Sequence, residues 1–239
     1  MAYQTTFKRY ELKYLLTRQQ KAQLLRVMEP YMALDEYGRT TIRNLYFDTD
    51  TYRLARRSIE RPAYKEKLRV RSYGPAGADS PVFVELKKKY DSVVYKRRLA
   101  LPNEQAMAWL CGDAALAPAT QISREIDYFR DYYESLRPVA FLSYEREAFR
   151  SRGGDDFRVT FDDTILFREE ALTLEAGAWG TPLLGENHVL MELKTPGGIP
   201  LGMVRFLSGQ RVYKTSFSKY GTAYETLIYP NHEGGRLYA

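Results

Sequence analysis

Residues 65–71 read Lys-Glu-Lys-Leu-Arg-Val-Arg, a regular alternation of cations with other residues. Side chains of a β-strand alternate between two faces, so this spacing puts four cations on one face. Neighbouring cations there lie about 6.6 Å apart, and each adjacent pair repels by about 2 kcal/mol at an effective dielectric near 20. Water would relieve most of this repulsion, so one such strand alone indicates a solvated sheet face.

Six further segments alternate ionic residues in a similar way, mixed with or backed by apolar and aromatic residues. They carry Arg9, Glu11 and Lys13; Glu85 and Lys87; Lys96 and Arg98; Arg146; Arg158, Thr160 and Asp162; and Glu192 and Lys194. A sheet with one ionic face explains each segment separately, whereas a closed barrel with an ionic interior explains them together. An enclosed cation cluster is stable only when a polyanion, water or counterions fill it. This pattern favours polyphosphate chemistry.

Composition limits the class of protein. At 239 residues we expect one domain over 1–239, with its core at about 7–228 and a flexible tail at 229–239. The net charge of +6 and the pI of 9.2 favour an acidic partner, namely phosphate, nucleic acid or an anionic membrane surface. Cys111 is the only cysteine, so no internal disulfide forms. The chain has no signal-like N-terminus and no membrane-length apolar run, so we expect a cytoplasmic protein.

Helices are expected between the strands. Thr17 and Gln20 resemble a capping box that opens a helix ending near Pro30. Further helices are expected from Asn103 to Gly112, from about Ser123 to Leu136, and from Leu201 to Ser208. The seven alternating segments and Thr41–Asp48 make eight expected strands, which fit a barrel wide enough for a small elongated ligand.

Several segments together resemble the VTC domain, the polyphosphate polymerase branch of the triphosphate tunnel metalloenzymes. In chain order they read YFDTDTYRL at 46–54, KEKLRVRSYG at 65–74, VFVELKKK at 82–89, VYKRR at 94–98, ISREIDYF at 122–129, FLSYEREAF at 141–149, VLMELK at 189–194 and TSFSKYGTAY at 215–224. The resemblance runs from about Phe7 to Leu227. It implies an α+β fold, a closed eight-stranded antiparallel β-barrel with flanking helices.

The resemblance also implies an activity, the transfer of the γ-phosphoryl group of ATP to a growing polyphosphate with release of ADP. The implied catalytic residues are Lys13, Arg69, Arg71, Lys87, Arg146 and Lys219. The expected substrate-binding residues are Arg9, Lys65, Lys67, Lys96, Arg158 and Lys194, of which Lys65 and Lys67 follow from strand parity. Glu192 matches the family's metal-binding glutamate and Glu11 is a second candidate, with Mn²⁺ or Mg²⁺ bridging phosphate oxygens.

Alternatives remain beside this interpretation. The superfamily often begins with Glu-x-Glu-x-Lys, whereas this chain has Arg9-x-Glu11-x-Lys13, which favours the polymerase branch although Glu11 is retained. A metal-dependent triphosphatase and a non-catalytic polyanion-binding module are the competing functions. The expected partners are ATP and inorganic polyphosphate, without nucleic acid, and a separate membrane protein could be a further partner. Two assignments stay open. Glu85 is a metal ligand or a salt-bridge partner, and Asp162 or Asp163 assists a metal or forms a turn. The cations of opposite parity to the ionic set are expected to be exterior charges, namely Lys88, Lys89 and Arg97.

Overall fold

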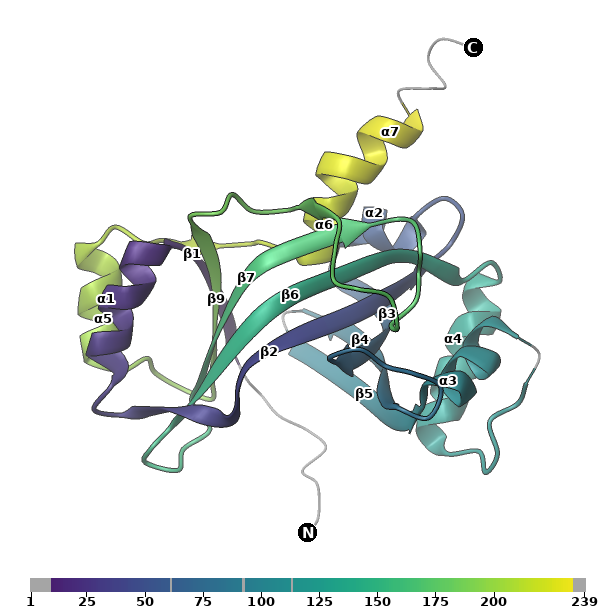
Figure 1. Cartoon of the computed structure of the whole chain (residues 1–239), viewed down its shortest axis with the longest axis horizontal. Helices are drawn as coiled ribbons and strands as arrows, with labels where there is room; N and C mark the ends of the chain where they lie inside the picture. Colours follow the sequence, from purple (N-terminus) through teal and green to yellow (C-terminus); the bar gives the residue numbers. More distant parts are fainter. Residues whose placement is uncertain (1–9, 61, 92, 113, 234–239) are drawn as a thin grey trace. The chain divides into compact units, whose positions relative to one another are not determined.

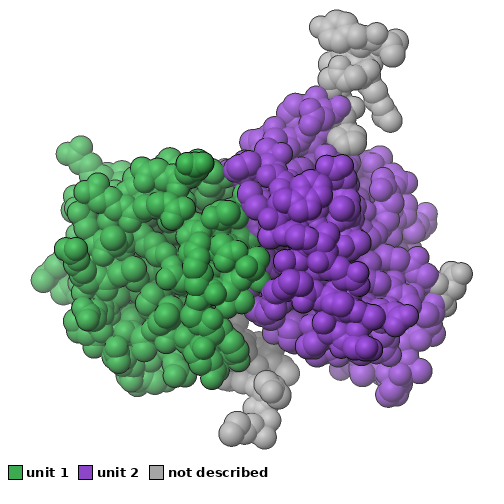
Figure 2. Space-filling model, viewed as in Figure 1, with its two compact units in different colours: residues 1–41, 144–165, 184–217 green, residues 42–143, 166–183, 218–239 purple. Residues whose placement is uncertain are grey.

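The computed structural model describes residues 10–60, 62–91, 93–112 and 114–233 (Figure 1). Residue contacts divide the chain into two compact units, coloured separately in Figure 2. Unit 1 comprises residues 1–41, 144–165 and 184–217, and unit 2 comprises residues 42–143, 166–183 and 218–239. The single domain expected over 1–239 stays a prediction.

The strands form an antiparallel sheet, which confirms the predicted α+β class and strand direction. The pairing order is β10-β1-β9-β7-β6-β2-β3-β4-β5, and β8 pairs with β7. Within the described residues this order ends at β10 and β5, so closure into a barrel stays a prediction. The strands are β1 (Tyr10–Thr17), β2 (Met32–Asp48), β3 (Tyr64–Tyr73), β4 (Pro81–Tyr90), β5 (Val93–Pro102), β6 (Arg137–Ser151), β7 (Arg158–Arg168), β8 (Thr181–Pro182), β9 (His188–Thr195) and β10 (Lys214–Thr215).

The four expected helices are present, and the sequence analysis misses the shorter ones. The helices are α1 (Arg18–Met28), α2 (Arg53–Ile59), α3 (Asn103–Cys111), α4 (Gln121–Tyr133), α5 (Leu201–Gly209), α6 (Lys219–Ala223) and α7 (Tyr229–Glu233), with a π-helical turn η1 (Tyr224–Ile228) before α7. The tail expected from residue 229 therefore begins as a helix, and residues 234–239 lie outside the described part. No helix in the described part of the chain is long and apolar enough to span a membrane.

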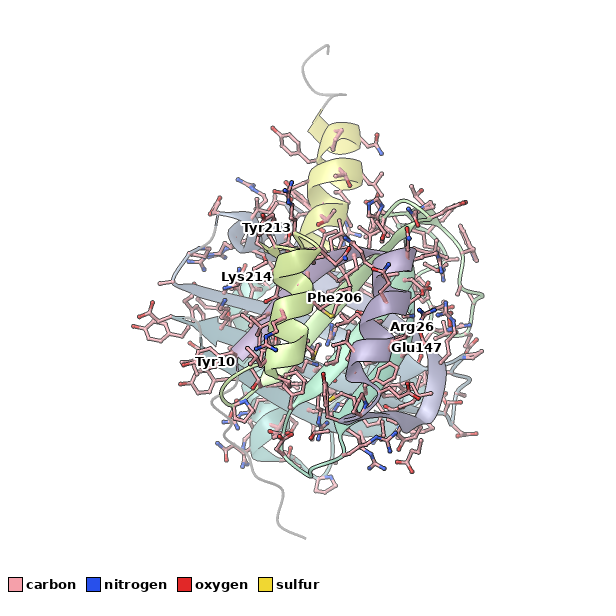
Figure 3. The ribbon with its side chains drawn as sticks, turned by 90° about the vertical axis from the view of Figure 1, so that its left-hand side faces the viewer. Tyr10, Arg26, Glu147, Phe206, Tyr213 and Lys214 are labelled. Carbon is pink, nitrogen blue, oxygen red and sulfur yellow. The ribbon has the colours of Figure 1, made fainter. Side chains whose placement is uncertain are left out.

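Unit 1 packs α1 and α5 on the apolar face of its strands, and Figures 1 and 3 show these helices side by side. The capping box starts α1, because Thr17 Oγ1 accepts from Gln20 N at 3.1 Å and Gln20 Oε1 accepts from Thr17 N at 2.9 Å. Leu24 and Met28 then fall one turn apart on the buried stripe of the helix. They join a core supplied by Met203 and Leu207 of α5 and by alternate strand residues, among them Tyr14, Leu16, Val159, Phe161, Val189, Met191 and Leu193.

Unit 2 packs α3 and α4 on the apolar face of β3 and β4. Alternate residues of these strands are buried against the two helices, and the indole of Trp109 donates to Asp127 at 2.8 Å to tie α3 to α4. Burial of each large apolar side chain contributes about 1.5–3 kcal/mol. The core contains Leu68, Val70, Val82, Val84, Leu86, Ala106, Trp109, Leu110, Ile126, Phe129 and Tyr133. Because this core takes one parity of each strand, the other parity is left for the ionic residues.

Candidate functional site

In unit 2, strand register aligns the ionic residues in rows across β2 to β5. Tyr46 pairs with Arg69, Arg69 with Glu85, and Glu85 with Arg98. The neighbouring rows on the same face are Asn44–Arg71–Phe83–Ala100 on one side and Lys67–Lys87–Lys96 on the other. The face expected from sequence alternation is therefore present on several adjacent strands.

The centre of this face is Glu85, whose side chain is 1% exposed and lies among four cations. Its carboxylate is 2.7 Å from Arg69 Nη2, 2.7 Å from Lys96 Nζ, 2.8 Å from Arg98 Nη2 and 4.0 Å from Arg71 Nε. We call these five residues cluster 2. Its formal charge is +3 when Lys96 is protonated, and burial lowers the pKa of Lys96 to about 7 although the charge of Glu85 raises it. Positive charge therefore exceeds negative charge around the single buried carboxylate. The structure thus makes Glu85 an ion-pair partner, one of the two roles left open by the sequence.

Electrostatics keep Glu85 ionised. Burial alone would raise the pKa of its carboxyl, but the charges of the four cations outweigh burial and hold the pKa well below its usual value. An isolated buried carboxylate would be neutral, and the four cations without it would repel one another, with Arg69 and Arg71 the least exposed to water. Glu85 therefore holds the cations together, and their excess charge is available for an anionic ligand.

Further contacts orient the arginines of cluster 2. Arg69 donates from Nη1 to the Tyr46 hydroxyl at 3.0 Å, and Arg71 donates from Nε to Asn44 Oδ1 at 3.0 Å. The Tyr46 ring stacks on Tyr220 with 4.7 Å between centroids. These contacts restrict the rotamers of two long side chains, which reduces the entropy lost when a ligand binds.

Tyr220 is itself held by Asp48. Its hydroxyl donates to Asp48 Oδ2 at 2.8 Å, while Asp48 also accepts from the backbone N–H groups of Leu54 and Ala55 at the start of α2. Burial raises the pKa of Asp48 despite these hydrogen bonds, which lower it. Asp48 therefore joins the end of β2, the N-terminus of α2 and the stack beneath Arg69.

The other predicted residues of unit 2 lie around cluster 2. Lys67 Nζ donates to Ser218 Oγ at 2.9 Å, next to Lys219, which is 8% exposed in α6. Lys65 Nζ donates to the Ser58 carbonyl at 3.3 Å, and Lys87 pairs in register with Lys67. The structure brings these residues onto or beside one sheet face, and their roles in binding stay predictions.

The exterior charges need one correction. Lys88 lies 3.7 Å from Glu66 and Arg97 lies 3.0 Å from Glu125, both on the face opposite to cluster 2, as expected from their parity. The prediction that Lys89 lies on that opposite face is wrong. Lys89 pairs with Lys65, so it belongs to the same face as Lys87, because residues two apart in a strand share a face.

Unit 1 contains a second group of ionic residues, which we call cluster 1: Lys13, Arg146, Asp162 and Glu192. Lys13 Nζ lies 3.3 Å from Glu192 Oε1 and donates to the Phe217 carbonyl at 2.7 Å. Arg146 donates to both oxygens of the fully buried Asp162, at 2.6 and 2.7 Å, and its Nη2 lies 3.9 Å from Glu192 Oε2. Two cations and two carboxylates thus alternate on one face.

Arg146 is the most tightly held cation of cluster 1. Burial alone would lower the pKa of its guanidinium, but the charge and hydrogen bonds of Asp162 outweigh burial and raise the pKa well above the usual value. Its guanidinium also lies 5.1 Å from the centroid of the Tyr144 ring. Asp162 therefore fixes Arg146, and the neighbouring Asp163 binds Arg39 instead, through contacts of 3.0 and 2.5 Å.

The remaining predicted residues of unit 1 are spread along the same strands. Glu11 pairs in register with Lys194, and Lys194 pairs with Arg158. The Arg158 side chain is 60% exposed and lies 3.7 Å from Asp156, so it is the most peripheral of the three. Arg9 lies outside the described residues.

The Glu192 carboxylate and the nearby Thr160 hydroxyl are oxygen ligands of the kind that Mg²⁺ and Mn²⁺ bind. Thr160 pairs with Glu192 in register, and its buried hydroxyl oxygen has no hydrogen-bond partner among the described residues. No group of three or more His, Cys, Asp or Glu side chains in the described part of the chain could surround a metal. Mg²⁺ and Mn²⁺ are commonly held by one or two carboxylates, with substrate phosphates and water completing the shell. Glu192 and Thr160 fit that mode.

Three residues that contribute to these clusters are not among the predicted catalytic, substrate-binding or metal residues, although the sequence analysis names Arg98 and Asp162 in the alternating ionic set and considers Asp162 near a metal. Arg98 shares the parity of Lys96 and contacts Glu85, so parity alone could have included it. Tyr46 and Asp162 act by holding Arg69 and Arg146, which depends on contacts between different strands. Such partners have no sequence signal until the strand register is known.

The fold and clusters define an α+β protein whose antiparallel sheet carries one cation-rich cluster around Glu85 and one cluster of balanced charge around Glu192. The family model of the VTC domain matches residues 8–228, so the chain belongs to the VTC domain family.

Two solved structures share the fold at low sequence identity. One is a candidate adenylate cyclase from Bacillus halodurans, with a TM-score of 0.55 and 16% identity over 90% of this chain and 96% of that chain. The other is HpAC1 from Hippeastrum, a candidate adenylyl cyclase described with a dominant triphosphatase activity, with a TM-score of 0.50 and 16% identity over 88% of this chain and 92% of that chain. No curated protein matches the chain.

Proposed function

We propose that this protein is a metal-dependent polyphosphate polymerase that transfers the γ-phosphoryl group of ATP to a growing inorganic polyphosphate. The observation that carries the proposal is cluster 2, in which four cations surround one buried carboxylate and leave a formal excess of three positive charges. Membership of the VTC domain family supports the same substrate class.

The chemistry suits the side chains present. In phosphoryl transfer, the protein mainly positions the substrates and stabilises negative charge on the transferred group. Arginine offers planar, bidentate donors and lysine offers a compact charge, so Arg69, Arg71 and Lys96 can bind phosphate oxygens. The attacking group is a phosphate oxygen that is already ionised at neutral pH, so the reaction requires no Ser, Cys or His nucleophile.

Glu192, with Thr160 beside it and Glu11 as the second candidate, would hold Mn²⁺ or Mg²⁺. When bound, the metal would neutralise phosphate charge and orient the phosphoryl group. Lys13 and Arg146 hold the Glu192 carboxylate at 3.3 and 3.9 Å, which limits its movement. Their positive charges also reduce repulsion between Glu192 and an approaching polyanion.

The product of the reaction tests the proposal. Purified protein with ATP and Mn²⁺ should yield a ladder of polyphosphate chains and ADP. Glu192→Gln should lose this activity. The matched control is Glu147→Gln, which should retain it, because Glu147 lies on the face of β6 opposite to Arg146 and pairs there with Lys21. Release of orthophosphate without chain growth would contradict the polymerase.

A triphosphatase is the second candidate, favoured by the activity with which HpAC1 is described and by the retained Glu11. It would hydrolyse inorganic or nucleoside triphosphate without extending a chain. Tight binding of polyphosphate with no turnover of any triphosphate would instead identify a non-catalytic polyanion-binding module. ATP and polyphosphate are thus the proposed partners, and a separate membrane protein is a further partner that the same preparation could be tested against.

A further inference from the structure

The cations on the face of unit 2 are separated by type along the strands. The rows at one end contain Arg71 beside Phe83, and Arg69 and Arg98 beside Glu85. The rows at the other end contain only lysines among their cations, with Lys67, Lys87 and Lys96 in one row and Lys65 with Lys89 in the next. The face therefore changes from arginine to lysine in one direction.

An aromatic platform closes the arginine end. Tyr73 is 50% exposed, and its ring meets Phe83 edge-on with 5.6 Å between centroids. The Arg98 guanidinium lies 4.0 Å from the Phe83 centroid and donates to the Tyr73 hydroxyl at 2.8 Å. Tyr73 is thus held in place on the same face as cluster 2, while much of its surface stays accessible.

The two ends suit different parts of a nucleotide. Arginine forms fixed, bidentate contacts with phosphate, whereas lysine is a mobile point charge that tolerates a sliding chain. An exposed, anchored aromatic ring is a stacking surface for a nucleobase, because every base presents a π-face. Among the described residues, the lysine rows offer no exposed ring of this kind. Val94 pairs with Lys89 there, and Tyr220, whose ring centroid is 6.0 Å from Lys67 Nζ, is only 1% exposed.

We infer that this face binds a nucleoside triphosphate in one orientation, with the base on Tyr73, the phosphates on the arginines, and the polyphosphate chain along the lysine rows. This inference rests on the proposed function and adds its direction. The terminal oxygen of the chain forms a bond to the γ-phosphorus while the bond from that phosphorus to the β–γ bridging oxygen breaks, and ADP departs with the electron pair. The nucleoside therefore stays at the aromatic end and the growing chain at the lysine end.

The base-stacking part is tested by comparing ATP with inorganic triphosphate. Calorimetric titrations without divalent metal should show that Tyr73→Leu weakens ATP binding by about 5- to 150-fold, while binding of inorganic triphosphate stays within about 2-fold. Tyr73→Phe should restore ATP binding to a large extent. The matched control is Tyr95→Leu, because Tyr95 is 49% exposed on the opposite face of β5 and should change neither ligand.

The lysine part is tested by a neighbouring pair of residues on opposite faces. Lys89→Gln should weaken the binding of long-chain polyphosphate and reduce the slope of log affinity against log salt by about one, with little change for ATP. Lys88→Gln, which removes the cation beside Glu66, should leave both affinities unchanged. Thermal melts of each variant show whether the fold is retained.

The outcomes separate this inference from the proposed function. Equal losses of ATP and triphosphate affinity in Tyr73→Leu, or equal effects of the two lysine variants, would overturn the inferred orientation even if the wild-type protein makes polyphosphate. Conversely, a selective loss of ATP binding would uphold the orientation even if no phosphate ladder forms, in which case only the polymerase would fail.

Discussion

Glu85→Gln is the most informative single change, because it removes one charge and almost no volume from the centre of cluster 2. The wild-type carboxylate is buried and contacts Arg69, Arg71, Lys96 and Arg98 within 4.0 Å. A neutral amide can accept hydrogen bonds from one or two of these cations but cannot balance their charge. The variant therefore leaves four mutually repelling cations on one face.

The expected loss of unfolding free energy in Glu85→Gln follows from the burial of the Glu85 carboxylate. Removing one partner of a buried ion pair typically costs about 3–5 kcal/mol, and Glu85 has several partners at 2.7–2.8 Å. For a chain of this size, each 1 kcal/mol shifts the melting temperature by about 2–4 °C, so we expect the midpoint to fall by about 6–20 °C. The loss should be partly reversed by inorganic triphosphate or polyphosphate, which supplies the missing negative charge.

The contribution of Glu85 to the stability of the folded protein decreases as the pH falls. The folded-state pKa of Glu85 lies well below its ordinary value of 4.5, so its contribution to stability is complete above about pH 5. That contribution is lost as the pH falls from 4.5 toward the folded-state pKa. The part of the difference in unfolding free energy between wild type and Glu85→Gln that comes from the carboxylate should accordingly shrink in acid. A second change is expected near neutral pH, because burial lowers the pKa of Lys96 to about 7 and the charge of Glu85 opposes this lowering.

Calorimetric melts at low ionic strength, with and without inorganic triphosphate, measure these quantities. Glu125→Gln is the control, because Glu125 is partly exposed and its pair with Arg97 should be worth about 0–1 kcal/mol. The reasoning would be refuted by a Glu85→Gln protein that melts within the range of this control, or by a ligand-induced rise in melting temperature no larger than that of wild type.

Other changes test the supporting contacts. Asp162→Asn weakens the bidentate partner of Arg146 and should reduce the unfolding free energy in urea by about 3–5 kcal/mol; a loss below 1 kcal/mol would contradict the view that this buried pair depends on its charge. Thr160→Val should change stability by less than about 1 kcal/mol, because its hydroxyl has no hydrogen-bond partner in the described part of the chain, but should raise the Mn²⁺ concentration needed for half-maximal activity. An unchanged Mn²⁺ dependence would remove Thr160 from the proposed metal site. Asp48→Asn turns a donor toward the N–H groups and the Tyr220 hydroxyl that Asp48 now accepts from, so thermal melts should show a loss of about 1–3 kcal/mol, and a neutral result would contradict its role in fixing α2.

Local patterns predicted the elements that depend on nearby residues. The Thr17–Gln20 capping box gave the start of α1, because both partners lie within one turn. The start of α2 could not be predicted in this way. Its first residue is preceded by Tyr52 with a φ of 54° and no side-chain cap, and the N–H groups of the helix are capped by Asp48 from the end of β2. A cap supplied from outside the helix has no short-range signature.

In the candidate site too, the sequence predicted one part, the face on which each cation lies, but not the other part, the ion-pair partner of each cation. Strand parity predicted which cations share a face. Arg98, which the sequence analysis puts in the ionic set but not among the site residues, follows this rule, and so does Lys89, for which the predicted face was wrong. The partner of each cation was not predictable, since Glu85 meets Arg98 and Arg69 only because β4 lies between β5 and β3 in a particular register. The Arg146–Asp162 pair has the same origin in contacts between β6 and β7.

The amino-acid sequence by itself determined the two faces of each strand, because a planar peptide chain in extended conformation must send successive side chains to opposite sides. Tertiary structure alone decided how the charges are balanced: four cations share Glu85, Arg146 is held by Asp162, and the arginines and lysines of unit 2 occupy opposite ends of one face. Electrostatic energy depends on distances across strands, and those distances exist only once the strands have paired.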